Sequence, residues 1–366
     1  MDLTNYWWQL IWVLLFGAVS LVMIPKRQEM VFGKPCMRWG RLSAFVLALP
    51  YVFWAAIRTS IYGDSGVYRS TFLNMPTGLS SFWSYVSSRS KGPLFVSFEY
   101  LFKTLLSDSP EVFFFAIALI QLVLLVRVYR KYSTDYWLSM FLFIASTDYM
   151  SWVHNGMRQF VAVVIIFACF PLLVERRYVL MCLVVLACAL IHSSALIFLP
   201  FVFVINGRAW NYRTMLFIGA LILSIIFLDK VTGFIVRSME ETVYVDDIDI
   251  FLKDDGTNIL RVLFYSVPAI VSWLFRERIY AKNDPVINIC ANLSIIAAGV
   301  YVFSFYTSGL LVGALPIYFS LANYILIPWL IREIFTGESV ILVEGGFIAL
   351  YSYFFYYQMG VTWKLL

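Results

Sequence analysis

Apolar runs of about 15 to 22 residues recur along the whole chain, separated by short polar segments. A helix that crosses a bilayer needs about 20 mainly apolar residues, so these runs predict transmembrane helices. The predicted spans are 6–24, 42–57, 111–128, 136–148, 159–174, 178–192, 194–206, 214–228, 258–275, 286–306, 310–331 and 339–357. The expected fold is therefore all-α, with about 12 transmembrane helices in a single transmembrane domain over residues 1–366.

Basic residues cluster at the ends of alternate runs, and such clusters tend to remain in the cytoplasm. The clusters assigned to that side are Lys26, Arg27, Lys34, Arg38, Arg41, Arg127, Arg130, Lys131, Arg176, Arg177, Arg208, Arg213, Arg276, Arg278, Lys282 and Arg332. This assignment places both termini outside. Residues 178–206 fit either one long tilted helix or a hairpin of two short helices, and basic residues at both ends favour the hairpin.

The composition agrees with a polytopic membrane protein. Hydrophobic residues make up 61% of the 366 residues and charged residues 13%, which leaves too little polar surface to cover a soluble globule. The mean hydropathy is +0.82. Asp2 precedes an aromatic-rich run that continues to Ile24 without a basic region or a small-residue cleavage site, so we expect an anchor instead of a signal peptide.

Several classes of chemistry have no signature in the chain. The five cysteines form no CxxC pair and only two histidines are present, which makes a metal site improbable. No phosphate-binding glycine loop is present either, which argues against an ATP-driven pump. We therefore expect no cofactor and no nucleic acid partner.

Two predicted outer segments, 58–110 and 229–257, are longer than simple turns. In the first, residues 92–107 place apolar side chains on one helical face and polar ones on another, which predicts a helix lying in the membrane interface. The second is rich in acids, which indicates a solvated surface, with cation or glycan binding as the alternative: Glu240, Glu241, Asp246, Asp247, Asp249, Asp254 and Asp255.

Three arginines lie at the predicted outer boundary of the membrane, namely Arg58, Arg158 and Arg261. A charge at this depth costs free energy unless it finds a partner or an aqueous cavity. Ion pairs of Arg58 with Asp64 and of Arg158 with Asp148 would satisfy two of them internally. The alternative is a diphosphate, whose oxygens match the planar guanidinium group.

An ordered set of motifs carries a family resemblance. Arg58 is followed by Gly63-Asp64 and Tyr68, then by Asn155-Gly156-Met157-Arg158-Gln159, then by His192-Ser193-Ser194-Ala195-Leu196. In order and spacing, residues 58 to 196 resemble the EpsG family, which is related to the Wzy-type polysaccharide polymerases. Lys91-Gly92 departs from the family pattern, because relatives often have an acid before the segment that is Pro93-Leu94-Phe95 here.

The resemblance implies transfer of a growing glycan from undecaprenyl diphosphate to another lipid-linked repeat unit. It also implies a metal-independent glycosyltransferase with a GT-C-like fold in the bacterial cytoplasmic (inner) membrane, its active site facing outward. Such polymerases make exopolysaccharide, capsule or O-antigen. A chain-length regulator and a flippase are the protein partners to expect.

Catalysis of this transfer needs cations beside the leaving diphosphate. We expect Arg158 first and Arg58 second in this role, with Arg261 as a third substrate-binding cation. The amides of Asn155 and Gln159 would bind phosphate, sugar hydroxyls or the opening backbone of a helix, and a helix cap is the alternative for Asn155.

The acceptor hydroxyl needs a group that orients it and accepts its proton. His192 and Asp64 are the two candidates, and Tyr68 is expected to contact the substrate. A core histidine bonded to neighbouring hydroxyls is the alternative for His192, and a turn aspartate bonded to its own backbone is the alternative for Asp64.

Two other functions compete with a polymerase. A flippase or other transporter of lipid-linked oligosaccharides would favour charges near the midplane and an internal repeat, and neither is evident in the sequence. A membrane acyltransferase acting on glycans would place its basic motifs on the side that meets acyl-CoA, normally the cytoplasm.

Overall fold

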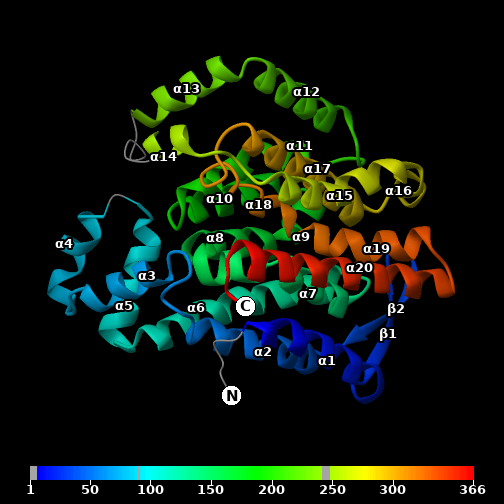
Figure 1. Cartoon of the computed structure of the whole chain (residues 1–366), viewed down its shortest axis with the longest axis horizontal. Coiled ribbons are helices and arrows are strands. Elements are labelled where there is room, and N and C mark those ends of the chain that lie inside the picture. The colour runs from blue at the N-terminus through cyan, green and yellow to red at the C-terminus, as the bar shows by residue number, and fades with distance from the viewer. Residues whose placement is uncertain (1–5, 90, 241–247) are drawn as a thin grey trace. The chain divides into compact units, whose positions relative to one another are not determined.

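The computed structural model describes residues 6–89, 91–240 and 248–366, and these residues are predominantly helical (Figure 1). The prediction of an all-α membrane protein is thereby confirmed. One small antiparallel hairpin, not predicted, joins the first two long helices and consists of β1 (Lys26–Val31) and β2 (Lys34–Trp39). Its turn residues Phe32 (φ 53°) and Gly33 (φ 73°) both have the positive φ of a tight hairpin turn.

The chain divides into two compact units that are each built from discontinuous segments. Unit 1 comprises the residues up to Ala168 together with Ala187–Ser193 and Pro328–Leu366. Unit 2 comprises Cys169–Leu186 and Ser194–Ile327. The helices α10 (Tyr178–Ala189) and α19 (Asn323–Ile334) and the 3₁₀ turn η3 (Ser193–Ile197) run across the boundaries.

Unit 1 contains long apolar helices and a group of short ones. Its elements are α1 (Trp7–Met23), α2 (Arg41–Ala56), α3 (Ser65–Asn74), η1 (Leu79–Ser81), α4 (Phe82–Ser87), α5 (Pro93–Leu105), α6 (Pro110–Tyr132), α7 (Tyr136–Ala145), η2 (Tyr149–Asn155), α8 (Met157–Ala168), α20 (Glu338–Tyr356) and η5 (Tyr357–Thr362). The segments η2 and η5 are π-helical.

Unit 2 combines several short helices with one long buried helix, Pro285–Phe305. Its elements are α9 (Phe170–Val174), α11 (Phe198–Val204), α12 (Tyr212–Ile226), α13 (Leu228–Glu240), α14 (Ile248–Lys253), α15 (Ile259–Leu274), α16 (Arg276–Lys282), α17 (Pro285–Phe305) and α18 (Ile317–Ser320). The bend between α12 and α13 is 94° (Figure 1).

Among the described residues, three helices are long and apolar enough to cross a membrane: Pro110–Tyr132, Pro285–Phe305 and Glu338–Thr362. The number rises to five if each of two bent pairs, α12 with α13 and α15 with α16, is one span. Six shorter apolar helices lie on other predicted spans. The total of about 12 spans stays a prediction.

Two predicted spans differ from the structure. The run 159–174 is broken at Cys169, where α8 has ended and the separate helix α9 begins, with Pro171 in its first turn. The run 310–331 is helical only in its second half, so the prediction of one continuous helix there is wrong. Its first half packs so closely on residues 256–257 that a side chain on Gly309 or Gly313 would collide with them.

The hairpin predicted for residues 178–206 is confirmed. The helix α10 ends at Ala189 and the chain turns before Ser193. The rings of Tyr178 and Phe203, at the two far ends of this region, lie 5.8 Å apart, so the two arms run antiparallel.

Part of the acidic outer segment 229–257 can be described, whereas Glu241, Asp246 and Asp247 lie outside the described residues. Asp254 accepts hydrogen bonds from the Ser308 hydroxyl (2.6 Å) and the Leu310 amide (2.7 Å). This acid therefore holds a loop of unit 2 in place.

Helices α2 and α6 form the antiparallel pair on which the candidate site depends. At one end the rings of Phe53 and Phe115 lie 5.2 Å apart. At the other end the Arg130 guanidinium donates to the Trp39 carbonyl (2.8 Å), just before α2 begins. With a rise of about 1.5 Å per residue, the 16 residues of α2 give the helix a length of about 24 Å, somewhat less than the thickness of about 30 Å of a hydrocarbon core.

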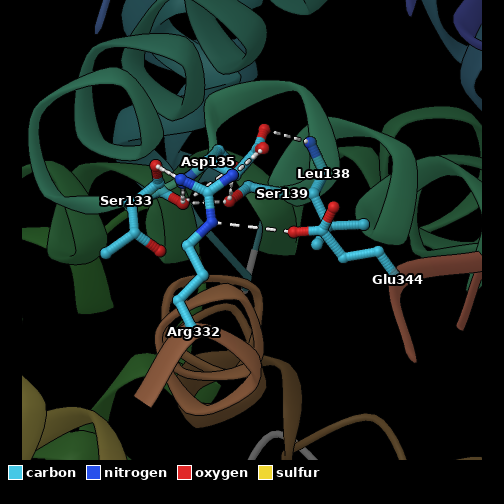
Figure 2. A network of polar contacts seen from close by, with 7 residues as sticks. Ser133, Asp135, Leu138, Ser139, Arg332 and Glu344 are labelled. Carbon is cyan, nitrogen blue, oxygen red and sulfur yellow. Dashed lines mark hydrogen bonds and ion pairs between the residues drawn. The ribbon is translucent and has the colours of Figure 1, made fainter. Parts of the chain in front are cut away.

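Within unit 1, an ion triad connects the C-terminal segment of the chain to the start of α7 (Figure 2). Arg332 lies 2.7 Å from Asp135, which also caps α7 by accepting from the Leu138 amide. The same guanidinium lies 3.6 Å from Glu344 on α20. Because apolar surroundings make an unpaired charge costly, the triad stabilises the packing of α7, α19 and α20.

We expect Arg332→Ala to lower the free energy of unfolding by about 2 kcal/mol, because it leaves two partly buried carboxylates without a cation. The side chains of Arg332 and Asp135 are only 29% and 22% exposed. The measurement is thermal or denaturant unfolding of the purified protein in detergent.

The matched control is Arg177→Ala, which removes an ion pair whose side chains are 60% and 51% exposed. Such a pair contributes less than about 1 kcal/mol. Equal losses in the two variants would contradict a structural role for the triad.

Candidate functional site

A π-helical turn and the start of α8 form the centre of the candidate site. Arg58, just beyond α2, is 4% exposed and donates through Nη1 to the carbonyls of Val153 (3.0 Å) and His154 (2.9 Å) at the end of η2. Its Nε donates to the Ala55 carbonyl (2.6 Å), and its guanidinium lies 4.4 Å from the ring centroid of Phe114. Arg58 thus satisfies carbonyl groups where two helices end.

Burial lowers the pKa of Arg58 to about 10, so the side chain still carries its charge at neutral pH. The same surroundings account for His154, which is 1% exposed and packs edge-on against Tyr149, with ring centroids 5.0 Å apart. Burial, with a smaller contribution from Arg58, holds the pKa of His154 well below its ordinary value. His154 is therefore a neutral core histidine.

The loop before α3 is fastened to this turn. The Asp64 amide donates to Asn155 Oδ1 (2.7 Å), and the Ser65 hydroxyl donates to the His154 carbonyl (3.0 Å). Gly63 has a φ of 54°, and a Cβ there would collide with the Asn155 side chain. The predicted motifs around residues 63 and 155 are thus in direct contact, with Asn155 positioning Asp64.

These elements enclose a cavity of about 380 Å³ in unit 1. It brings together three of the predicted site residues, Asp64, Tyr68 and Arg158. The other lining residues are Val67, Thr71, Tyr85, Arg89, Lys91, Phe95, Val96 and Glu99. The charged groups are thus three cations and two acids, supplied by α3, α5, α8 and the segment between α4 and α5.

Arg158 is the cation that α8 presents to the cavity. Its Nε is buried and has no hydrogen-bond partner among the described residues. Neither of the predicted ion pairs, Arg58 with Asp64 or Arg158 with Asp148, occurs in the part of the chain that the structure describes. A buried guanidinium nitrogen with unused hydrogen-bonding capacity favours an anionic ligand.

Tyr68 lies between the two arginines and the aspartate. Its hydroxyl is hydrogen-bonded to the backbone of Arg158. Burial is the main cause that raises the pKa of Tyr68, and Asp64 raises it further, whereas Arg158 and Arg58 lower it. The hydroxyl consequently remains protonated at neutral pH, beside both Asp64 and Arg158.

Glu99 is an acid that the sequence analysis did not select. It is 4% exposed, lines the cavity from α5, and its Oε1 has no hydrogen-bond partner among the described residues. Burial raises the pKa of Glu99 to about 7, although Arg158, Arg89 and Lys103 all act to lower it. The signal in the sequence was a single acid within the amphipathic segment 92–107.

The helix α5 confirms the predicted amphipathic segment and shows which face points inward. Lys103 donates to three carbonyls at the end of α3, those of Phe72 (2.7 Å), Leu73 (2.8 Å) and Met75 (2.7 Å). The polar face is therefore packed against the protein. Most of the apolar face is exposed: Leu94 47%, Phe98 39%, Leu101 36% and Leu105 63%. Such a helix suits the membrane interface.

The exception on this apolar face is Phe102, which is buried. In the sequence it shares the apolar helical face with Leu94, Phe98, Leu101 and Leu105. It instead packs edge-on against Phe113 of α6, with ring centroids 5.4 Å apart.

His192 lies in the turn between α10 and η3, within the part of that turn that belongs to unit 1. Burial, with smaller contributions from Arg158 and Lys91, lowers its pKa to about 4. The neighbouring backbone meets α5, because the Leu94 amide donates to the Leu190 carbonyl (3.0 Å). A Cβ on Gly92 would collide with the Ile191 carbonyl and would lie 3.4 Å from Arg158 Cδ.

Besides Arg58, Asn155 and His192, two further predicted site residues do not line this cavity. Gln159 follows Arg158 on α8 and is 8% exposed. Arg261 lies on α15 in unit 2, with its guanidinium 5.8 Å from the ring centroid of Tyr265.

Comparison with protein-family models matches the EpsG family over residues 41–362. This range covers most of the chain and includes every residue of the cavity. Neither the curated proteins nor the solved structures contain a match.

We expect the stability of the protein to depend on pH through Glu99. Between its ordinary value of 4.5 and about 7, the folded protein keeps a proton that the unfolded chain has lost. The free energy of unfolding should therefore decrease by up to about 3 kcal/mol as the pH rises through this window. Glu99→Gln should remove that decrease in denaturant titrations at a series of pH values.

Glu277→Gln is the control for Glu99→Gln, because the Glu277 side chain is 80% exposed. It should leave the pH dependence as in the wild type. An identical pH slope in the wild type and in Glu99→Gln would show that Glu99 does not titrate as its burial requires.

Proposed function

This chain belongs to the EpsG family, a family of Wzy-like polysaccharide polymerases, and we propose that it joins lipid-linked repeat units into a polysaccharide. In detail, we propose transfer of a glycan from undecaprenyl diphosphate to a sugar hydroxyl of a second lipid-linked repeat unit. The observation that carries this proposal is the cavity in which Arg158, without an acidic partner among the described residues, lies beside two carboxylic acids and a half-buried tyrosine.

The cations of the cavity fit the leaving group. In this transfer the acceptor oxygen attacks the anomeric carbon, the bond to the phosphate oxygen breaks, and the lipid diphosphate leaves with the electron pair. Fixed cations stabilise that charge most when little reorganisation is needed. We assign Arg158 to the diphosphate, assisted by Arg89 and Lys91, without recourse to a metal ion.

Arg58 and Asn155 support the site indirectly. The hydrogen bonds of Arg58 to the end of η2 and of Asn155 to Asp64 hold α8 and the 63–65 loop in place. We therefore propose that both are positioning residues, although the sequence had suggested direct contact with the substrate. For Gln159 and Arg261, substrate binding stays a prediction from the sequence.

Three groups compete as the acceptor of the proton. A general base works best when its pKa lies near the working pH, and this favours Glu99, with a pKa of about 7. His192 is a weak base, because burial and, to a smaller extent, Arg158 and Lys91 lower its pKa to about 4. We propose that Glu99 accepts the proton, while Asp64, Tyr68 and His192 orient the two substrates.

The location of the cavity supports the proposed topology. It lies at the end of the α2–α6 pair that carries Arg58, whereas Arg41 and Arg127 lie at the opposite end. Since basic clusters favour the cytoplasm, the cavity would open at the outer leaflet of the bacterial cytoplasmic membrane. The exposed apolar face of α5 agrees with a helix at that interface. A GT-C-like arrangement of about 12 spans belongs to the same proposal.

We expect Arg158→Ala to abolish chain extension without preventing membrane insertion, so that single repeat units accumulate on lipid. The measurement is the ladder of products formed when the purified protein receives a defined lipid-linked repeat unit. Arg158→Lys should recover only part of the activity, because an ammonium group lacks the planar pair of donors that matches a diphosphate.

The control is Arg177→Ala, which removes an arginine of the exposed pair with Glu175. It should give the ladder of the wild type. Normal polymerisation by both Arg158→Ala and Arg158→Lys would eliminate the diphosphate role.

We expect Glu99→Gln to lower turnover by a factor of about 100 to 10,000 and to leave the apparent affinity for the repeat unit nearly unchanged. In the wild type the rate should increase as Glu99 ionises near pH 7, and this limb should disappear in the variant. The measurement is the pH profile of transfer by purified protein.

Asp64→Asn and His192→Ala tested in the same assay distinguish the three groups. Each should affect the apparent affinity at least as much as turnover and should retain the limb near pH 7. Loss of that limb in His192→Ala alone, with Glu99→Gln unaffected, would transfer the role of base to His192.

A further inference from the structure

A second basic cavity lies at the other end of the α2–α6 pair, about 24 Å along α2 from the candidate site. It has a volume of about 690 Å³ and lies between the β1–β2 hairpin and the two helices. Its charged lining residues are Arg38, Arg41, Arg127, Arg130, Lys131 and Glu29. Five cations thus face one acid, in a place that the polymerase reaction does not use.

Two of these cations belong to the structure of the hairpin. Arg38 lies 3.0 Å from Glu29 and donates to the Arg130 carbonyl, while Arg130 donates to the Trp39 carbonyl (2.8 Å). The other cations remain available. Neither Arg41 nor Arg127 makes an ion pair with any described residue, and both side chains are exposed. The hairpin is therefore held in place by its own hydrogen bonds and ion pair, next to Arg41 and Arg127, which have no ion-pair partner among the described residues.

The same cavity has an apolar wall. Phe45 of α2 and Val123 and Val126 of α6 line it together with the basic residues. Beyond it, exposed apolar side chains continue along both helices away from the charged end, with Val46 38% and Ile120 39% exposed. A soluble anion would need only the cations. Cations next to an apolar surface suit a ligand that has both a phosphate group and hydrocarbon chains.

We propose that this cavity binds the phosphodiester headgroup of an anionic phospholipid, whose acyl chains lie along α2 and α6. Arg41 and Arg127 contact the phosphate, and Phe45 and Val123 contact the first methylene groups of the chains. The lipid fixes the end of the helix pair opposite the candidate site. This proposal is independent of the reaction proposed above, because it uses none of the residues of the 380 Å³ cavity.

The test measures lipid selectivity of the full-length protein in phosphatidylcholine vesicles that contain spin-labelled phosphatidylglycerol or spin-labelled phosphatidylcholine. The wild type should immobilise phosphatidylglycerol in preference to phosphatidylcholine. Each cation near an anionic headgroup contributes about fivefold, so Arg41→Ala with Arg127→Ala should reduce that preference by up to about thirtyfold. Arg276→Ala with Arg278→Ala removes the same charge near α16 and should leave the preference unchanged.

A second measurement needs no variant. Raising the ionic strength should weaken the preference of the wild type, because screening acts on headgroup contacts. A preference that is insensitive to salt, or one that persists in the Arg41 and Arg127 double variant, overturns the proposal. Displacement of the labelled phosphatidylglycerol by inorganic diphosphate at constant ionic strength also overturns it, since the site would then belong to a soluble anion.

Discussion

The buried guanidinium of Arg58 is the interaction on which the site depends. In an apolar medium every exposed backbone carbonyl is costly, and the chain between α7 and α8 leaves such groups at the end of a π-helical turn. Arg58 satisfies two of them and ties the end of α2 to the same point. Since α8 begins immediately afterwards, this one side chain sets where Arg158 starts its helix.

A second constraint operates on the polar face of α5. Lys103 closes the end of α3, and this contact turns Glu99 away from solvent and toward the cations of the cavity. Most of the apolar face is left exposed, as suits a helix at a membrane interface. The same packing therefore buries Glu99, and this burial raises the pKa of the acid.

Helix positions were largely predictable, because apolar runs and basic clusters are local features that the membrane selects directly. The hairpin at 178–206 followed from basic residues at its two ends. The prediction of one continuous helix over 310–331 was wrong, since apolar composition does not reveal that Gly309 and Gly313 pack against another segment of the chain. The β1–β2 hairpin was not predicted, because its residues are mainly polar and the predicted elements rested on apolar runs.

The sequence by itself determined that the chain is a membrane protein with the motifs of its family, because composition, order and spacing are properties of the linear chain. Only the tertiary structure distinguished the surroundings of Arg58 from those of Arg158. Both arginines lie at a predicted outer boundary, yet one donates to carbonyls in the interior and the other faces a cavity. The tertiary structure also selected Glu99, since the pKa of a carboxylic acid depends on the burial and charges around it, and these come from helices distant in sequence.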